Sequence, residues 1–454
     1  MSTTAPERTR PRDRKQRIED AAALAFAEHG YHGVGMSDVA AAVGISAPAL
    51  YRHFPNKYAL FVRTALALAH RLIEDTDAAA ALPLDSPGEA RAAIDALLDA
   101  VISTTIQLRA TGGIYRWEGR YLERDDRDRL TAEFTRLRGR FEVAHRVLRP
   151  EVDETDRRQL VLAALSAVAS ITAHHTVVAA KSLRMLLRGA AWRVLEADLP
   201  AASSAGGVSS RFARRAPGEV EDVSSRFARS TPGEVSAPVR EAPDEPVPGA
   251  PRGAQRRDET QQSHSDESPL PSTPRREQLV ESAIRLFAAR GYNEVTIEDL
   301  ATQVGLTPSG IYRHFEGKSA LLLAACDRAA VELERAVLRE REAAASADDA
   351  LARLCRAYVD HTFAHLGLMR VYFSEIGNLA PDEQRRLRAL QRAHIADWVA
   401  LLQAVRPELS GREAAVLVHA GLGVVADQAP LLEHRDASAA VRLTHLVEVV
   451  LGVA

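Results

Sequence analysis

Cysteine, lysine and long apolar runs are scarce in this sequence. Cys326 and Cys355 are the only cysteines among 454 residues. Two thiols in so long a chain exclude a disulfide framework and a thiolate metal site, and they are typical of a reducing compartment. The first 15 residues, MSTTAPERTRPRDRK, have no apolar core and do not form a signal peptide. We therefore expect a cytoplasmic protein.

The sequence also lacks the marks of a membrane protein. Its most apolar stretch, residues 160–180, is interrupted by serine, threonine and the adjacent His174 and His175. We interpret this stretch as a buried helix of a bundle and expect no membrane partner. A formal charge of −3 and 46% hydrophobic residues are typical of a soluble chain that can hold two or more domains.

Catalytic signatures are absent as well. The sequence has no glycine-rich phosphate loop, no nucleophile elbow and no His-Glu metal helix, so we expect neither an enzyme nor a cofactor. His361 and His365 share a helix face, whereas the adjacent His174 and His175 point in different directions. Because no cysteine or clear carboxylate partner accompanies either pair, we expect no metal site.

A 48-residue repeat is the strongest feature of the sequence. Residues 14–61 align without a gap with residues 275–322, at an offset of 261 (291 − 30), and 18 of the 48 pairs are identical. The identical positions include the tetrapeptide Tyr-Arg-His-Phe at 51–54 and 312–315. A repeat of this length indicates duplication of a whole unit.

Each copy has the pattern of three helices. In the second copy, apolar residues recur at helical spacing up to Gly291, a short helix is expected over 297–304, and Gly305 supplies the turn. Thr307 suits the N-cap and Pro308 the first position of a third helix. This is the order of a helix-turn-helix, whose last helix enters the major groove of DNA.

The two copies are similar to the N-terminal DNA-binding domain of the tetracycline-repressor (TetR) family. The resemblance covers about 48 residues per copy and includes the Gly-Tyr helix end, the glycine turn, the Tyr-Arg-His-Phe helix and the lysine that follows. It implies an all-α fold of two units, each with a three-helix DNA-binding head and a helical ligand-binding and dimerisation bundle. Family members with a single copy are about half as long, so the chain resembles two such repressors in tandem.

The resemblance implies a DNA-contact surface in each head. The start of each recognition helix would face bases, the tyrosine, histidine and lysine would hold phosphates, and nearby hydroxyls would add single hydrogen bonds. Phe54 and Phe315 are expected to pack inside the heads. The expected DNA-binding residues are Ser37, Ser46, Ala47, Pro48, Ala49, Tyr51, His53 and Lys57 in the first head, and Thr296, Thr307, Pro308, Ser309, Gly310, Tyr312, His314 and Lys318 in the second.

Both heads depart from the family pattern. Neither has Arg, Asn or Gln at the start of its recognition helix, so bidentate reading of guanine or adenine is not expected there. Specificity would come from thymine methyl groups, site spacing and DNA shape. The family usually has a threonine before the second helix. The second head has Thr296, whereas the first has Gly35, and we expect Ser37 to cap that helix instead.

The two heads also differ in charge. Residues 1–63 contain nine Arg and Lys against six Asp and Glu, whereas residues 272–323 contain six of each. Since phosphate attraction drives non-specific affinity, we expect the first head to bind DNA more tightly. The basic arm over residues 1–13 either follows the minor groove or is a disordered tail of little consequence. The second head either binds DNA or serves only in dimerisation.

The rest of the chain is expected to form two helical bundles and a disordered linker that is rich in Pro, Gly, Ser and charge. The expected helices span about 57–77, 87–112, 114–123, 126–148, 155–176 and 181–198, and then 318–344, 347–366, 369–378, 382–405, 410–430 and 436–452. The expected domains are the arm (1–13), a first head (14–61), a first bundle (62–199), the linker (200–273), a second head (274–322) and a second bundle (323–454).

For each bundle the family resemblance implies a ligand pocket and a dimer interface formed by the last two helices. The aromatic stretches 112–122 and 369–379 are expected to line pockets for a small, apolar effector, and ordinary core packing is the alternative for each residue. The expected ligand-binding residues are Tyr115, Trp117, Glu118, Tyr121, Tyr372, Phe373 and Glu375.

The sequence therefore predicts a ligand-responsive DNA-binding regulator, and the resemblance implies a repressor. Its expected partner is double-stranded DNA with an imperfect palindromic operator, because the two recognition helices differ. The two units are expected to pair within one chain as a pseudo-dimer, with a homodimer as the alternative. The alternative function is a ligand-sensing or protein-binding helical scaffold with one or both heads no longer site-specific.

Overall fold

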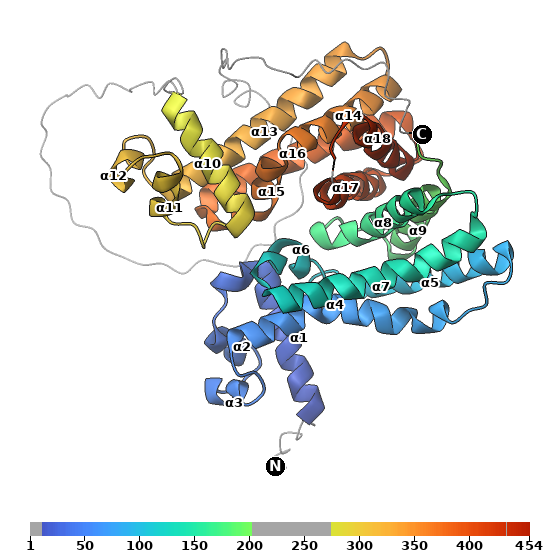
Figure 1. Cartoon of the computed structure of the whole chain (residues 1–454), viewed down its shortest axis with the longest axis horizontal. Helices are drawn as coiled ribbons and strands as arrows, with labels where there is room; N and C mark the ends of the chain where they lie inside the picture. The colour runs from blue at the N-terminus through green and yellow to red at the C-terminus, as the bar shows by residue number, and fades with distance from the viewer. Residues whose placement is uncertain (1–10, 202–273, 433) are drawn as a thin grey trace, which may run out of the picture. The chain divides into compact units, whose positions relative to one another are not determined.

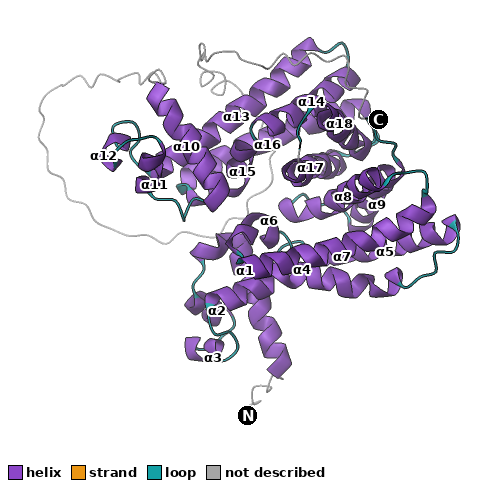
Figure 2. Ribbon diagram, in the orientation of Figure 1, coloured by secondary structure: helices purple, strands orange, loops and turns teal. Residues whose placement is uncertain are grey.

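The structure is a computed structural model of the chain, and it describes residues 11–201, 274–432 and 434–454 (Figure 1). These residues form helices joined by turns, and they contain no strand (Figure 2). The expected all-α fold is confirmed. The expected linker lies outside the described residues apart from 200 and 201, and so does most of the expected basic arm.

The order of helices repeats between the two units. The first unit contains α1 (Pro11–Gly33), α2 (Met36–Ala42), α3 (Ala47–Tyr51), α4 (Lys57–Ala80), α5 (Pro87–Gln107), α6 (Ile114–Glu118), η1 (Gly119–Tyr121), α7 (Arg124–Leu148), α8 (Glu154–Ala169), η2 (Ser170–Ala173) and α9 (Ala180–Glu196). The second contains α10 (Pro274–Arg290), α11 (Ile297–Gln303), α12 (Pro308–Ile311), α13 (Lys318–Ala343), α14 (Ala347–Ala364), α15 (Leu366–Ser374), η5 (Ile376–Asn378), α16 (Pro381–Val405), α17 (Gly411–Gln428), η6 (Ala429–Leu431) and α18 (Ala437–Leu451).

Glycines set the corners of both heads. Gly30 has a φ of 70° and interrupts the helical backbone of α1, and Gly44 has a φ of 70° between α2 and α3. The counterparts Gly291 and Gly305 have φ values of 84° and 65°. A side chain at these backbone angles would be strained. The predicted glycine turns are therefore confirmed in both copies. Helix α1 begins at Pro11, three residues before the expected start of the head.

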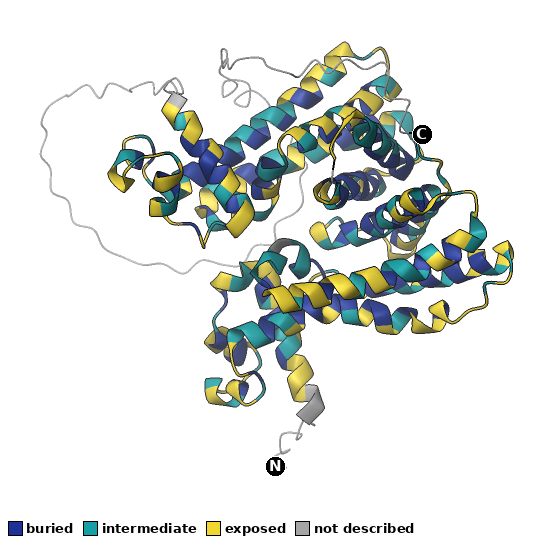
Figure 3. Ribbon diagram, viewed as in Figure 1, coloured by how far each residue is buried: buried dark blue, intermediate teal, exposed yellow. Residues whose placement is uncertain are grey.

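The first head closes around a separate apolar core that includes a few bundle residues, whereas the buried residues of the second head are continuous with the core of the bundles. Phe54 and Phe315 are only 3% and 5% exposed, which confirms their expected burial. Figure 3 shows the buried residues on the sides of the helices that face one another and the exposed residues on the outer sides. A serine caps the helix that follows α4 or α13 in each unit: Ser86 of α5 accepts a hydrogen bond from the Glu89 N–H, and Ser346 of α14 accepts one from the Asp349 N–H.

Two helices of the first bundle end earlier than expected. Helix α5 ends at Gln107 and not at Gly112. A Cβ on Gly112 would lie 2.9 Å from the Leu108 carbonyl oxygen and 3.2 Å from the Leu68 side chain, so the chain turns where the packing is closest. Helix α8 ends at Ala169 and not at residue 176.

Tertiary contacts explain the early end of α8. Arg109 donates hydrogen bonds to the carbonyl oxygens of Ile171 (2.9 Å) and His174 (2.8 Å), so these groups are satisfied outside a helix. The His174 ring stacks on His419 of α17, with centroids 4.0 Å apart and planes within 9°. This segment therefore joins the two units.

The last two helices of one unit pack against those of the other. Helices α8 and α9 contact α17 and α18. Arg193 of α9 donates to the carbonyl oxygens of Val449 (2.9 Å) and Val450 (2.7 Å) of α18. Gly423 of α17 comes so close to η2 that a Cβ there would lie 3.1 Å from Ser170 Cβ.

Helix α17 is the most apolar long helix of this interface. Among the described residues, the segment Gly411–Leu431 is the one helix long and apolar enough to cross a membrane by length and composition. It is 56% buried inside the protein and packs against α8, α16 and α18. Its apolar character is therefore explained by its place in the core.

Candidate nucleic-acid interface

The starts of the two recognition helices, α3 and α12, carry exposed hydroxyl groups. Ser46 and Thr307 have the extended backbone of an N-cap, but neither side chain accepts a hydrogen bond from the helix. The expected N-cap position of Thr307 and the start of α12 at Pro308 are confirmed, but the Thr307 side chain makes no capping hydrogen bond. Its Oγ1 instead lies 2.9 Å from Ser309 Oγ, and Ser46, Thr307 and Ser309 are all exposed.

The remaining expected base-facing residues lie on the same surface in both heads. They are small, and they leave room for the close approach of a groove wall. Pro48 and Pro308 are exposed, whereas Ala47, Ala49 and Gly310 are half-buried. None of them offers a bidentate hydrogen-bonding group, as the sequence indicated.

Matched polar groups follow at the ends of the recognition helices and in the turns directly after them. Tyr51 and Tyr312 are 50% and 57% exposed, and His53 and His314 are half-buried next to them. An exposed tyrosine is unremarkable by itself, but its repetition at one position of two heads places a phenol hydroxyl on each surface. A phenol or an imidazole N–H at this place can donate to a phosphate oxygen.

The sequence analysis omitted two arginines of this surface. Arg52 and Arg313 are exposed at the end of the recognition helices, within the repeated tetrapeptide. Each adds a permanent positive charge between the tyrosine and the histidine. Their identity in both copies was the signal that could have identified them.

The two motif lysines have partners inside their own heads. Lys318 Nζ donates to the carbonyl oxygens of Tyr292 and Val295, both at 2.9 Å, and lies 4.1 Å from the centroid of the Tyr292 ring. Lys57 Nζ lies 4.5 Å from the centroid of the Tyr31 ring and 3.5 Å from the His32 carbonyl oxygen. Burial lowers the pKa of both ammonium groups. In this structure both lysines hold the first helix of the head against α4 or α13.

The second helices of the two heads begin differently. Thr296 Oγ1 accepts from the Asp299 N–H (3.1 Å), and the Thr296 N–H donates to Asp299 Oδ2 (2.9 Å), which completes a capping box for α11. In the first head Gly35 occupies the N-cap position and donates its N–H to Asp38 Oδ2 (2.8 Å). The expectation that Ser37 caps α2 is wrong, because Ser37 lies inside the helix and is exposed.

Two of the residues expected to bind a ligand instead tie each head to its bundle. Glu118 Oε2 accepts a hydrogen bond from the Tyr31 N–H at 2.7 Å. Glu375 accepts one from the Tyr292 N–H, the same position of the second head. Glu375 is 1% exposed and lies 2.5 Å from Arg120 Nη1 of the first unit. Burial raises the pKa of its carboxyl, and Arg120 opposes that shift.

A cleft of about 870 Å³ lies where the two units meet near the heads. Glu118, Tyr121 and Phe373 line it, together with residues of both heads such as Gly30 and Asn293. Its lining also includes polar side chains. These include Arg120, His175 and Gln384. The cleft therefore differs from the apolar pocket inside one bundle that the sequence indicated.

Tyr115, Tyr372 and Glu375 do not line this cleft. Tyr115 is half-buried and packs on Phe134, with ring centroids 4.9 Å apart. Tyr372 is 2% exposed and belongs to the core, as Glu375 does. The side chain of Trp117 lies outside the described residues. Core packing thus accounts for the aromatic residues that the cleft does not include.

Comparison with known proteins places both heads in one family of domains. Residues 18–64 and 279–325 match the model of the bacterial regulatory proteins of the tetR family. The uncharacterized HTH-type transcriptional regulator YerO from Bacillus subtilis (strain 168) is 40% identical over 53 residues, 12% of this chain and 18% of that protein. The HTH-type transcriptional activator FasR from Mycolicibacterium smegmatis is 33% identical over 90 residues, 20% of this chain and 41% of that protein. The chain thus spans less than half the length of these curated relatives.

Solved structures of similar proteins match about two fifths of the chain. A TetR-family transcriptional regulator from Bordetella parapertussis 12822 is 20% identical, with a TM-score of 0.37, over 39% of this chain and 95% of that protein. A bacterial regulatory protein in the tetR family from Rhodococcus RHA1 is 22% identical, with a TM-score of 0.36, over 40% of this chain and 97% of that protein.

Proposed function

The chain belongs to the tetR family of bacterial regulatory proteins through two copies of the family's DNA-binding domain, and on this premise we propose that it is a cytoplasmic transcription regulator that binds double-stranded DNA with both heads. The observation that carries the proposal is the repeated surface of α3 and α12. Tyr51 and Tyr312 are each at least half exposed, and an exposed arginine follows each of them.

The chemistry of this surface is that of phosphate binding. The phenol, imidazole and guanidinium groups all donate hydrogen bonds, and the arginine also neutralises a phosphate charge. The small residues at the helix starts allow contact with thymine methyl groups. The two lysines act indirectly, because they fix the end of the head's first helix or the loop after it against the helix that follows the recognition helix. Sequence discrimination then depends on these few contacts, on the spacing of two half-sites and on DNA shape.

We propose that the two units form an internal pseudo-dimer. The packing of α8 and α9 against α17 and α18 supports this arrangement, since one chain then brings two heads together without a second copy. The half-buried ion pair between Arg116 and Asp427, 2.7 Å long, also joins the units. The heads differ in sequence, so the operator is an imperfect palindrome with half-sites about one helical turn, roughly 34 Å, apart.

A small effector would act on the separation of the heads. A ligand that binds one arrangement of the units more tightly shifts the population toward it, and DNA affinity changes with that shift. The cleft between the units is the place we propose for such a ligand, and its lining favours a molecule with polar groups over a purely apolar one. We propose repression as the outcome, in line with the family resemblance, and a reporter gene behind the upstream DNA should fall in expression when the chain is present.

Salt-dependent DNA binding of matched head variants tests the function. Arg52→Ala and Arg313→Ala should each weaken binding to the chain's own upstream DNA and each lower the salt slope by about 1, because each removes one phosphate contact. Arg124→Ala is the control, since this arginine is 91% exposed and lies outside the heads. If only Arg52→Ala lowers the salt dependence of DNA binding, the second head does not bind DNA. Equal affinity for upstream and random DNA would favour the scaffold alternative.

A further inference from the structure

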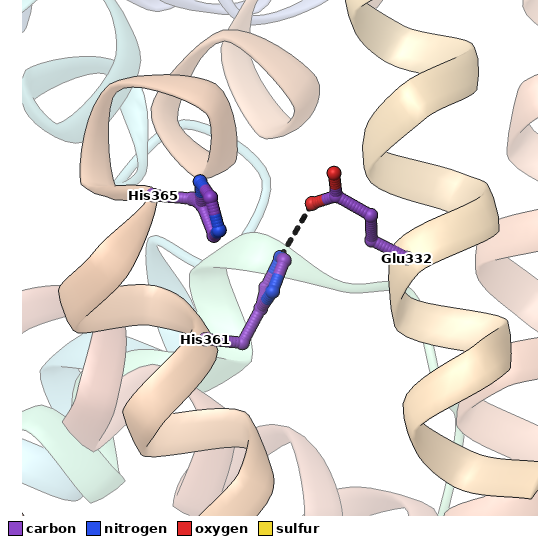
Figure 4. Close-up of side chains that lie close together, drawn as sticks. All are labelled: Glu332, His361 and His365. Carbon is purple, nitrogen blue, oxygen red and sulfur yellow. Dashed lines mark ion pairs between the residues drawn. The ribbon is translucent and has the colours of Figure 1, made fainter. Parts of the chain in front are cut away.

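Three potential metal ligands meet at one end of the second bundle. Glu332 extends from α13, His361 lies in the last turn of α14, and His365 follows at the joint between α14 and α15 (Figure 4). One ligand atom from each residue lies within 4.8 Å of the other two. No carboxylate partner of the histidine pair is evident in the sequence, and the fold supplies one from a different helix.

Two of the polar atoms at this place lack a hydrogen bond. Glu332 Oε2 and His361 Nε2 are buried and have no hydrogen-bond partner, although they lie 3.6 Å apart. At that distance the two atoms are too far apart for a hydrogen bond. A buried polar atom without a hydrogen-bond partner costs stability, so the close approach of Glu332 Oε2 and His361 Nε2 needs another explanation.

The spacing fits a shared metal ion. Zn²⁺ binds imidazole nitrogen at about 2.0–2.1 Å and carboxylate oxygen at about 2.0–2.2 Å in a tetrahedron, which places two ligand atoms about 3.4 Å apart. The 3.6 Å between Glu332 Oε2 and His361 Nε2 is close to this value. His365 is exposed and free to complete the set by a small rotation, and its exposure gives an ion a path to the site.

The charges around the site also suit a cation. His361 offers an imidazole nitrogen and Glu332 a carboxylate oxygen, and both are ligand types that Zn²⁺ binds. The nearby Arg328 is engaged by Glu277 (2.7 Å) and Glu281, which offset its positive charge. Arg339 is a second cation near His361, and it weakens the site without blocking it.

Within the described residues, the first unit has no such cluster. Counted from the matched lysines Lys57 and Lys318, the position of Glu332 is occupied by Arg71. Counted from the N-cap serines, the positions of His361 and His365 are occupied by Val101 and Thr105. The three ligand residues therefore occur together in one unit only, and the helix packing shared by both units does not require them.

We propose that Glu332, His361 and His365 bind one divalent transition-metal ion of the Zn²⁺ class, with the fourth position open to water or a ligand. Three protein ligands with one open position is a common arrangement for such ions. The site lies at the joint that leads into α15, and α15 packs on α10 of the second head. The proposal does not rest on the DNA-binding function.

Zinc binding by the full-length chain without a histidine tag tests the site. Competition with a chromogenic chelator gives stoichiometry and affinity, and Co²⁺ absorption reports a four-coordinate environment. We expect one tight Zn²⁺ per chain. His361→Asn, His365→Asn and Glu332→Gln should each weaken it by more than about 100-fold, because even loss of an outer-shell partner costs 10–100-fold. His434→Asn is the matched control, an exposed histidine outside the cluster.

Each result bears on the proposal. His365 is exposed, so His365→Asn should fold normally, and circular dichroism checks this for every variant. Weaker binding in the three ligand variants, with unchanged binding in His434→Asn, supports the site. Wild-type chain without a tight Zn²⁺, or ligand variants that bind as tightly as His434→Asn, would overturn it.

Discussion

Each unit uses a carboxylate of its bundle to hold the end of the head's first helix, but the two carboxylates have different surroundings. Glu118 is half-buried and accepts the Tyr31 N–H, whereas Glu375 is fully buried and is also paired with Arg120 of the first unit. Both units therefore have the contact between head and bundle, and the second unit has in addition the ion pair with Arg120 of the first unit. The second head is tied to both units, and the first head mainly to its own.

The largest expected effect comes from breaking that added contact. Arg120→Met leaves the Glu375 carboxylate buried without its cation, and loss of one partner of a buried pair costs about 3–5 kcal/mol. Glu118→Gln in the first unit removes only one charged acceptor and should cost about 1.5–3 kcal/mol. Urea unfolding of the two variants measures both free energies. Equal losses of unfolding free energy in the two variants would mean that the ion pair between Arg120 and Glu375 adds no stability.

The next effect is acid destabilisation of the contact between units. Burial lowers the pKa of His419 to about 4 and that of His174 to about 2, from 6.5. As the pH falls, the histidines of the unfolded chain are protonated before those of the folded chain. The contribution of the two histidines to the free energy of unfolding is therefore fully present above about pH 6.5 and decreases as the pH approaches 4. The decrease is roughly 1.4 kcal/mol per pH unit for each histidine. His419→Leu should therefore flatten the slope between pH 6 and 4.5.

Unfolding free energies of wild type and His419→Leu at several pH values give this slope. His361 and His394 also have pKa values lowered to about 4, and they contribute equally to both proteins. The difference between the two slopes therefore belongs to His419 and the ring that it stacks on. Identical slopes would show that the stacked pair is not buried in solution.

The two lysines should differ in their contribution to stability. Lys318 makes two hydrogen bonds of 2.9 Å to carbonyl oxygens, whereas Lys57 makes one long contact of 3.5 Å. Hydrogen bonds to a charged group contribute about 1.5–3 kcal/mol, so Lys318→Met should cost about 2 kcal/mol and Lys57→Met less than 1. Thermal unfolding checks the order, and a larger loss for Lys57→Met would contradict the geometry.

The smallest effects are expected at the second helices of the heads. Thr296→Ala removes a side-chain cap and should cost about 1 kcal/mol. Gly35→Ser should stabilise the first head by a few tenths of a kcal/mol, because it supplies the cap that the glycine lacks. A Cβ at position 35 meets Asp38 Oδ2 at 2.9 Å, and this carboxylate can rotate away. Destabilisation by Gly35→Ser would mean that the Asp38 contact matters more than the cap.

Local sequence signals were sufficient to predict most of the helices and the turns between them. Gly30 and Gly44 predicted the corners of the first head because few other residues adopt their backbone angles. The helix expected from residue 87 does begin there, since α5 starts at Pro87 after the Ser86 cap. The end of α8 was missed because it depends on Arg109, about sixty residues earlier, which satisfies the carbonyl oxygens of the unwound segment.

The contacts between helices could not be predicted in the same way. Glu332 and His361 are distant in sequence and lie on different helices, and Arg116 meets Asp427 from the other unit. Periodicity indicates which face of a helix is buried, but it does not indicate which helix covers that face. The candidate DNA surface was more accessible to sequence reasoning, because its residues lie within a few positions of one another and occur twice.

The mass of the chain in solution, free and on its own upstream DNA, tests the pairing of two heads in one chain most directly. One chain has a mass of 49.4 kDa. Sedimentation should give that mass for the free protein, and one chain per operator in the complex. A mass near twice that value, with two chains on each operator, would contradict the internal pseudo-dimer and indicate a homodimer with four heads.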